Sequence, residues 1–278
     1  MPFCCRIRAL DCPSEETTLT FEMLARSITS CRIQIQVLAA ALFLWSFGVN
    51  GLAADAHLGN MKATKVLFLG NSICIVPRSP TPPNDYGASA STPEKDYVHL
   101  LAKRIEARTN SKLRLVPTNN TIKNPDGSTV TGDANIVNIA DIFERGYATY
   151  SADRLKKQIA WQPDIVVLQF GENIPHEKYD AVVFKQSLQR LVADLKNSSN
   201  PHIFFTGYIL GANPAIDDIK RQVCAEDPTH RFFVDLSSVW HDPANHGELG
   251  HPNDQGMAML ADLLFRAMET HATLQEKK

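Results

Sequence analysis

Short, continuously apolar runs alternate with segments of helical periodicity along most of this 278-residue chain. Runs without interspersed polar residues are typical of parallel strands that are buried on both faces. The runs are VLFL at 66–69, LRLV at 113–116, IVVL at 165–168, IFF at 203–205 and FFV at 232–234, of which LRLV is the weakest. The alternation predicts an α/β protein in which helices cover both faces of a mainly parallel sheet.

Between these runs, apolar residues recur every three or four positions, as on the buried side of an amphipathic helix. The segments are 94–108, 153–160, 180–196, 214–224 and 255–270, of which 214–224 is the least regular. Pro93 suits a first helical turn, and Ser91 or Thr92 is available as its N-cap. We expect two long loops at 77–93 and 117–150, and a small hairpin within the second, where TIKNPDGSTVT surrounds the turn-forming NPDG.

The N-terminal region has the order of a secretory signal peptide. Arg26 and Arg32 precede the apolar run VLAAALFLWSFGV at 37–49, and the small residues GLAADA follow at 51–56. We therefore expect a removable leader over 1–56, a single mature domain over 57–278, and a secreted or periplasmic protein. Initiation at Met23 would give the leader a basic region of ordinary length. Because the run is shorter than the roughly 20 residues that span a bilayer, no stable membrane anchor is expected.

The net charge argues against nucleic-acid binding, and the cysteine positions predict the state of the thiols. The formal net charge is −2, which provides no basic field for nucleic acid. Four of the six cysteines lie in the expected leader, so only Cys74 and Cys224 remain in the mature chain. Because the expected fold places these two at opposite ends of the sheet, we predict two unpaired thiols.

Four short stretches carry side chains suited to catalysis. They are GNS at 70–72, RGYAT at 145–149, QFGEN at 169–173 and GELGHPNDQG at 247–256. The first and third follow predicted strands, and active sites of α/β folds lie at the carboxyl ends of the strands. Seen locally, Ser72 could simply cap the helix that follows it, so the other three stretches decide its interpretation.

In this order, the four stretches resemble the SGNH (GDSL-type) hydrolase superfamily. Its members have a nucleophilic Ser after the first strand, an oxyanion Gly, a G-x-N block and an acid-x-x-His block near the C-terminus. The resemblance covers about three quarters of the chain, namely everything beyond the leader. The expected fold is then a three-layer α/β/α domain with a flavodoxin-like sheet of about five strands, and the expected activity is ester hydrolysis without a metal or cofactor.

The resemblance assigns a role to each candidate residue. Ser72 would be the nucleophile, His251 the general base, and Glu248 the acid that orients the imidazole. Family members usually have Asp where Glu248 stands, and Asp242, Asp254 or a Ser–His dyad without an acid remain as alternatives.

The oxyanion would be held by the Asn173 amide, the backbone N–H of Ser72 and a third N–H from 145–149. Gly146 is the only glycine in that segment, although the spacing would also suit Ala148. Asn71 replaces the family's more usual Asp, which leaves the support around Ser72 as an open question.

Two other functions remain as alternatives. One is a metal hydrolase that uses the side chains of His241, Asp242, His246, Glu248, His251 and Asp254. The other is a non-catalytic glycan-binding relative, which the departures at Asn71 and Glu248 would permit. We favour an esterase that removes small acyl groups from carbohydrate, with a small-molecule or polysaccharide ester as its partner; the sequence does not predict the oligomeric state.

Overall fold

The computed structural model describes residues 55–77, 85–118, 121–123, 129–131, 133–175, 177, 179–211 and 213–274. Of the predicted leader over 1–56, residues 1–54, with the four cysteines, lie outside these residues, whereas residues 55 and 56 lie inside them. Within the described part of the chain, no helix combines the length and the apolar character that a membrane crossing requires.

A parallel sheet forms the centre of the molecule, and each strand pairs with its neighbours in parallel. The strands, in spatial order, are β12 (Arg231–Val234), β11 (His202–Thr206), β10 (Ile165–Gln169), β3 (Val66–Gly70), β9 (Ile136–Asn138) and β6 (Pro117–Thr118). Without the two-residue edge strand β6, and read from β9 to β12, the strands lie in the order 2-1-3-4-5, numbered by their position along the chain. This is the flavodoxin-like order that the sequence predicted.

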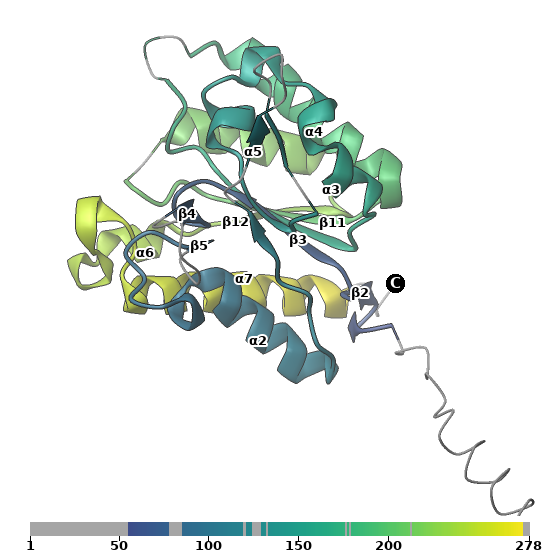
Figure 1. Cartoon of the computed structure of the whole chain (residues 1–278), viewed down its shortest axis with the longest axis vertical. Coiled ribbons are helices and arrows are strands. Elements are labelled where there is room, and N and C mark those ends of the chain that lie inside the picture. Colours follow the sequence, from purple (N-terminus) through teal and green to yellow (C-terminus); the bar gives the residue numbers. More distant parts are fainter. Residues whose placement is uncertain are drawn as a thin grey trace, which may run out of the picture. The chain divides into compact units, whose positions relative to one another are not determined.

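Helices cover both faces of this sheet, as Figure 1 shows, which confirms the three-layer prediction. One face is covered by α2 (Tyr97–Thr109) and α7 (Asp254–Leu274). The other is covered by α3 (Lys156–Ala160), α4 (Ala181–Ser199) and α5 (Pro214–Ala225).

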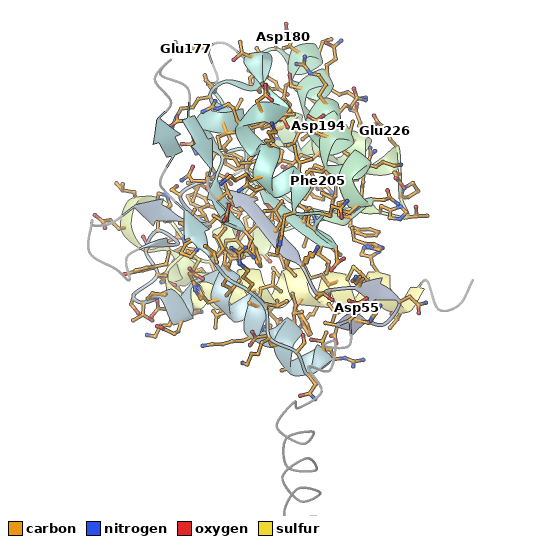
Figure 2. The ribbon with its side chains drawn as sticks, turned by 45° about the vertical axis from the view of Figure 1, so that its right-hand side comes forward. Asp55, Glu177, Asp180, Asp194, Phe205 and Glu226 are labelled. Atoms are coloured by element: carbon orange, nitrogen blue, oxygen red, sulfur yellow. The ribbon has the colours of Figure 1, made fainter. Side chains whose placement is uncertain are left out.

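The continuously apolar strands are explained by these two layers. In β3, Val66 and Phe68 pack in the core beside α2 and α7, whereas Leu67 and Leu69 pack in the core on the opposite face. Alternate side chains of a strand point to opposite faces, so a strand covered on both sides needs apolar residues at every position. In Figure 2, Phe205 of β11 lies inside, while Asp180 and Glu226 lie at the periphery.

Short elements connect the main ones. Three antiparallel pairs are β1 (His57–Leu58) with β2 (Met61–Lys62), β4 (Val76–Pro77) with β5 (Asp85–Tyr86), and β7 (Thr121–Lys123) with β8 (Thr129–Thr131). The last pair confirms the predicted hairpin, whose turn lies outside the described residues. The remaining short helices are η1 (Pro93–Lys95), η2 (Ala140–Glu144), η3 (Tyr147–Thr149), η4 (Ala152–Leu155), α6 (Ser237–His241), η6 (Pro243–Asn245) and η7 (Glu248–Gly250).

Two expectations differ from the structure. Residues 113–116 form no strand. The sheet instead includes the edge strand β6, directly after them, and β9, both inside the segment expected to be a loop. A strand of only three residues gives too short an apolar run to be recognised. The helix expected at 94–108 begins instead at Tyr97, because the Asp96 carboxylate accepts the hydrogen bond of the His99 N–H and caps it there. Cys74 and Cys224 are both free and buried.

Candidate active site

The register of the two central strands brings two of the predicted stretches together. Gly70 at the end of β3 lies opposite Gln169 at the end of β10. Ser72 and Asn173 follow these positions and so emerge at the same edge of the sheet. Gly70 cannot carry a side chain, because a Cβ there would overlap that of Cys74 and lie 2.8 Å from the Gln169 side-chain oxygen. The tight turn that presents Ser72 therefore depends on this glycine.

The structure joins the first and last stretches by a direct hydrogen bond. The Ser72 Oγ lies 2.9 Å from the Nε2 of His251, although the two residues are 179 positions apart. On the other side of the ring, Nδ1 lies 3.2 Å from the main-chain carbonyl oxygen of Glu248. That carbonyl can only accept, so the proton belongs on Nδ1, and Nε2 is left as the acceptor for the Ser72 hydroxyl. This is the tautomer that a general base requires.

The partner of His251 differs from the one predicted. It is the main-chain oxygen of Glu248, and within the described residues no carboxylate bonds the ring. The reason is the short turn η7, in which the carbonyl of one residue reaches the residue three positions later. The two alternative acids are also engaged elsewhere, since Asp242 accepts from the Ala244 N–H and Asp254 binds Lys95. The geometry is that of the Ser–His dyad.

A pocket of about 360 Å³ opens beside the dyad. Its lining consists of Ser72, Val76, Ala88, Ser89, Glu248, Leu249 and His251. Leu249 is 86% exposed and has a left-handed backbone with φ of 53°, a conformation that costs a non-glycine residue about 1–2 kcal/mol. Such strain is found preferentially at functional sites. The Ser89 hydroxyl donates to the Glu248 carbonyl, the same oxygen that faces His251, at 3.1 Å.

Asn173 and Gly146, the residues predicted to hold the oxyanion, are not hydrogen-bonded to the Ser72–His251 dyad within the described residues. The Asn173 amide nitrogen donates to Glu144 at 2.8 Å, and its oxygen accepts from Arg145 at 2.9 Å. Gly146 precedes η3, with φ of −124° and ψ of 24°. Among the described residues, no hydrogen bond joins Ser72 to Asn173 or to Gly146. Within that same part of the chain, the backbone N–H groups of Ser72 and Gly146 donate to no other residue outside the regular helices and strands.

Sequence reasoning missed Glu144, which is fully buried behind the Ser72 turn. Its carboxylate accepts hydrogen bonds from Asn71, Gly171 and Asn173. The available signal was an acidic residue at the end of the largely apolar stretch IADIFE, just before RGYAT. Burial raises the pKa of the neighbouring Glu172, and the charge of Glu144 raises it further.

The side chains proposed for a metal site do not converge. His246 stacks on Trp240 and binds its carbonyl oxygen at 2.8 Å, while Asp254 binds Lys95 at 2.7 Å. Nowhere in the described ranges do three His, Cys, Asp or Glu side chains gather closely enough to hold a metal ion. The described residues therefore give no support to the alternative of a metal hydrolase built on residues 241–254.

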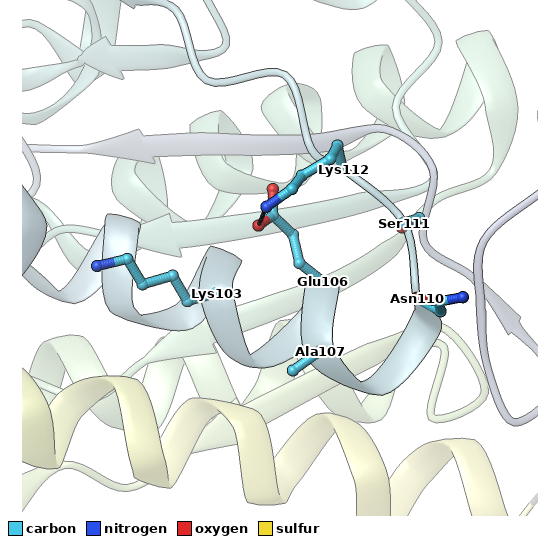
Figure 3. A pocket seen from close by; sticks show the side chains of 6 residues that line it. All are labelled: Lys103, Glu106, Ala107, Asn110, Ser111 and Lys112. Atoms are coloured by element: carbon cyan, nitrogen blue, oxygen red, sulfur yellow. Dashed lines mark hydrogen bonds and ion pairs between the residues drawn. The ribbon is translucent and has the colours of Figure 1, made fainter.

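A second pocket, of about 470 Å³, lies at the C-terminal end of α2 (Figure 3). Its lining consists of Lys103, Glu106, Ala107, Asn110, Ser111 and Lys112. Two of its three charged side chains bind each other, since the Lys112 Nζ lies 2.9 Å from the Glu106 carboxylate. Although this pocket is larger, it contains none of the predicted site residues.

Comparison with known proteins found matches among solved structures alone. No protein-family model matches the chain, and no curated protein matches its sequence. Its structural neighbours are SGNH/GDSL-type esterases over about three quarters of the chain.

Three of these solved structures illustrate the range of sequence identity and structural similarity to this chain. A family two carbohydrate esterase from Clostridium thermocellum, an active-site mutant, has 18% identity and a TM-score of 0.45 over 76% of this chain and 64% of that one. The chain thus spans less than two thirds of that esterase. A carbohydrate esterase family 3 structure from Talaromyces cellulolyticus has 16% identity and a TM-score of 0.48, over 76% and 98%. A putative lipolytic protein of the G-D-S-L family from Desulfitobacterium hafniense has 15% identity and a TM-score of 0.41, over 73% and 99%.

Proposed function

We propose that this chain is a secreted or periplasmic serine ester hydrolase that removes small acyl groups, such as acetyl, from carbohydrate. The observation that carries the proposal is the 2.9 Å contact between the Ser72 Oγ and the His251 Nε2 at the mouth of a pocket. A serine hydroxyl is a weak nucleophile until an adjacent base accepts its proton. The predicted N-terminal signal sequence supports export, and the resemblance of the four motifs supports the substrate class.

In the first half of the reaction, the Ser72 Oγ bonds to the ester carbonyl carbon while its proton passes to the His251 Nε2. The carbonyl oxygen becomes an oxyanion, which the backbone N–H groups of Ser72 and Gly146 and the Asn173 amide would stabilise. Collapse of this intermediate breaks the bond to the alcohol, which leaves with the proton from His251. The acyl group remains on Ser72.

In the second half, His251 removes a proton from water, and the resulting hydroxide attacks the acyl carbon. The bond to Ser72 then breaks, and its oxygen recovers the proton from His251. The Glu248 carbonyl keeps the ring oriented throughout and accepts the Nδ1–H bond, which strengthens when the ring is positively charged. The pocket beside Ser72 offers Val76, Ala88 and Leu249 as its apolar lining for the substrate.

An esterase panel on the mature chain tests the proposal, with acetylated sugars compared against longer acyl esters and p-nitrophenyl acetate. We expect turnover of acetyl esters in the wild type and a loss of at least about 10³-fold in Ser72→Ala with the fold intact. Full activity in Ser72→Ala would refute the mechanism. Carbohydrate binding without ester turnover, unchanged in Ser72→Ala, would instead indicate the non-catalytic glycan-binding alternative.

A further inference from the structure

We propose that Glu144 and Glu172, with the Asn71 amide between them, form one positioning unit that fixes Ser72 relative to Asn173. These are positioning residues, since they act through Ser72 and Asn173 and do not touch the proposed substrate. The inference rests on the proposed ester hydrolysis. It concerns three buried or partly buried groups that the mechanism itself leaves unused.

Asn71 is the member of this unit that holds the nucleophile. It is completely buried, and its amide nitrogen lies 2.6 Å from Glu172 Oε2 and 3.2 Å from Glu144 Oε1. Its side-chain oxygen accepts from the Ile73 N–H at 3.0 Å, and its own N–H donates to Gln169 at 3.1 Å. Ser72 is therefore flanked on both sides by backbone groups whose positions Asn71 determines.

Glu144 performs the same task for the oxyanion side. Its Oε1 accepts from the backbone N–H of Gly171 at 2.6 Å and of Asn173 at 3.2 Å, and its Oε2 accepts from the Asn173 amide at 2.8 Å. One carboxylate thus binds the turn after β10 and, through Asn71, the turn after β3. Because Asn173 is held at both its backbone and its side chain, its remaining amide N–H has a fixed direction.

Glu172 completes the unit and connects it to the next strand end. Its Oε1 accepts from the Ile209 N–H at 2.9 Å, and its Oε2 accepts from Gln169 at 3.1 Å as well as from Asn71. Nearby, the fully buried Lys220 Nζ binds the carbonyl oxygens of Phe170 at 2.6 Å and Thr206 at 2.9 Å. Its positive charge counteracts the rise in the pKa of Glu172.

The unit explains why position 71 is Asn in this chain and not the family's more usual Asp. Only the amide can donate to Glu144 and Glu172 while its oxygen accepts from Ile73. An aspartate would place a third carboxylate against two others, in surroundings where an unpaired charge is costly. The departure noted in the sequence is therefore matched by two glutamates that require a donor at this position.

A double-mutant cycle with Asn71→Asp and Glu172→Gln tests the unit. The first variant adds the third carboxylate, and we expect kcat for p-nitrophenyl acetate to fall about 100-fold with little change in KM, because small misplacements of catalytic groups have effects of this size. Adding Glu172→Gln restores the total charge and supplies an amide that can donate to Asp at position 71. We expect the double variant to recover at least about tenfold of the loss.

Asn135→Asp is the matched control. Asn135 is equally buried and donates to the Val66 and Arg114 carbonyl oxygens, at the end of β3 opposite to Ser72. We expect both Asn135→Asp and Asn71→Asp to lower the resistance to urea. Asn135→Asp should nevertheless leave kcat per folded molecule within about twofold of the wild type. If Asn71→Asp does not fold, Glu144→Gln replaces it and should lower kcat in the same way.

Three outcomes would overturn the inference. One is an unchanged kcat in Asn71→Asp or in its replacement Glu144→Gln. The second is a double variant no better than Asn71→Asp, and the third is a loss of kcat in Asn135→Asp equal to that in Asn71→Asp. A wild-type chain that neither hydrolyses esters nor reacts at Ser72 would refute the proposed function and this inference together. Ser72-dependent turnover in the wild type, combined with any of the three outcomes, refutes the inference alone.

Discussion

The two loops that meet at the proposed site are held in opposite ways. The turn around Ser72 is fixed by buried side chains, with Asn71 fully enclosed between Glu144 and Glu172. The loop around His251 is held mainly by its own backbone, through the Gly247 N–H to the His251 carbonyl at 2.6 Å and the His251 N–H to Glu248 at 3.0 Å. The partly buried nucleophile therefore follows a residue enclosed in the core, whereas the partly buried base lies on a loop held by its own main chain.

This difference predicts which substitutions should affect the activity. Changes on the nucleophile side disturb charged groups with little access to water, where an unmatched group is expensive. Changes on the base side meet exposed side chains, such as Leu249, and leave the main-chain partner of the imidazole in place. Function on that side should depend on His251 itself and on the course of the backbone.

The largest effect expected on the base side is that of His251→Ala. Loss of the general base should lower kcat/KM for p-nitrophenyl acetate by about 10³-fold, while urea unfolding stays close to that of the wild type. His241→Ala is the control, because His241 is an exposed residue at the end of α6 and should leave kcat/KM unchanged. If both variants kept full activity, the base would lie elsewhere.

An intermediate effect is expected from Leu249→Gly. Glycine relieves the left-handed strain but gains freedom in the unfolded chain, so the free energy of unfolding should rise by only about 0.5 kcal/mol. Because Leu249 lines the pocket, KM for acetyl esters should rise several-fold while kcat stays similar. Urea denaturation and steady-state kinetics measure both quantities.

Gln162→Gly is the matched control for Leu249→Gly. Gln162 has a φ of 56° and lies after α3, outside the pocket lining. It should give a comparable change in stability with no change in KM. A rise in KM in both variants, or in neither, would show that Leu249 does not contact the substrate.

The smallest effect is expected from Glu248→Gln. The main-chain carbonyl that faces His251 is kept, so kcat/KM should change by less than about threefold, measured with p-nitrophenyl acetate. If the carboxylate were the orienting acid, the same substitution would cost about 10⁴-fold. A loss of that size would show that a side-chain carboxylate orients His251, and that the His251 loop does not depend on its main chain alone.

Much of the fold could be predicted because each prediction rested on a long pattern. The strands β3, β10, β11 and β12 are apolar runs, and the helices that cover them have clear periodicity. The strand β9 was missed because three residues leave no measurable pattern. For the same reason, the segment expected to be one long loop contained part of the sheet.

For the site, the sequence predicted that Ser72 and His251 meet, but not how either of them is held. Ser72 and His251 were assigned because the four motifs resemble those of SGNH hydrolases, with Ser72 after a predicted strand and His251 just before the last helix. The pattern Glu-x-x-His cannot distinguish a side-chain carboxylate from the main-chain carbonyl of the same residue. Glu144 was missed because nothing local indicates that a glutamate will be buried against segments nearly 30 and more than 70 positions away.

The most direct test of the central claim is to treat the mature chain with a serine-directed fluorophosphonate and locate the adduct by peptide mass spectrometry. The account predicts one adduct, on Ser72, that forms rapidly in the wild type and is lost in His251→Ala. Cys74 should stay unmodified, because burial raises the pKa of its thiol to about 12. An adduct on any other residue, or labelling of Ser72 at the same rate without His251, would contradict the proposed Ser72–His251 dyad.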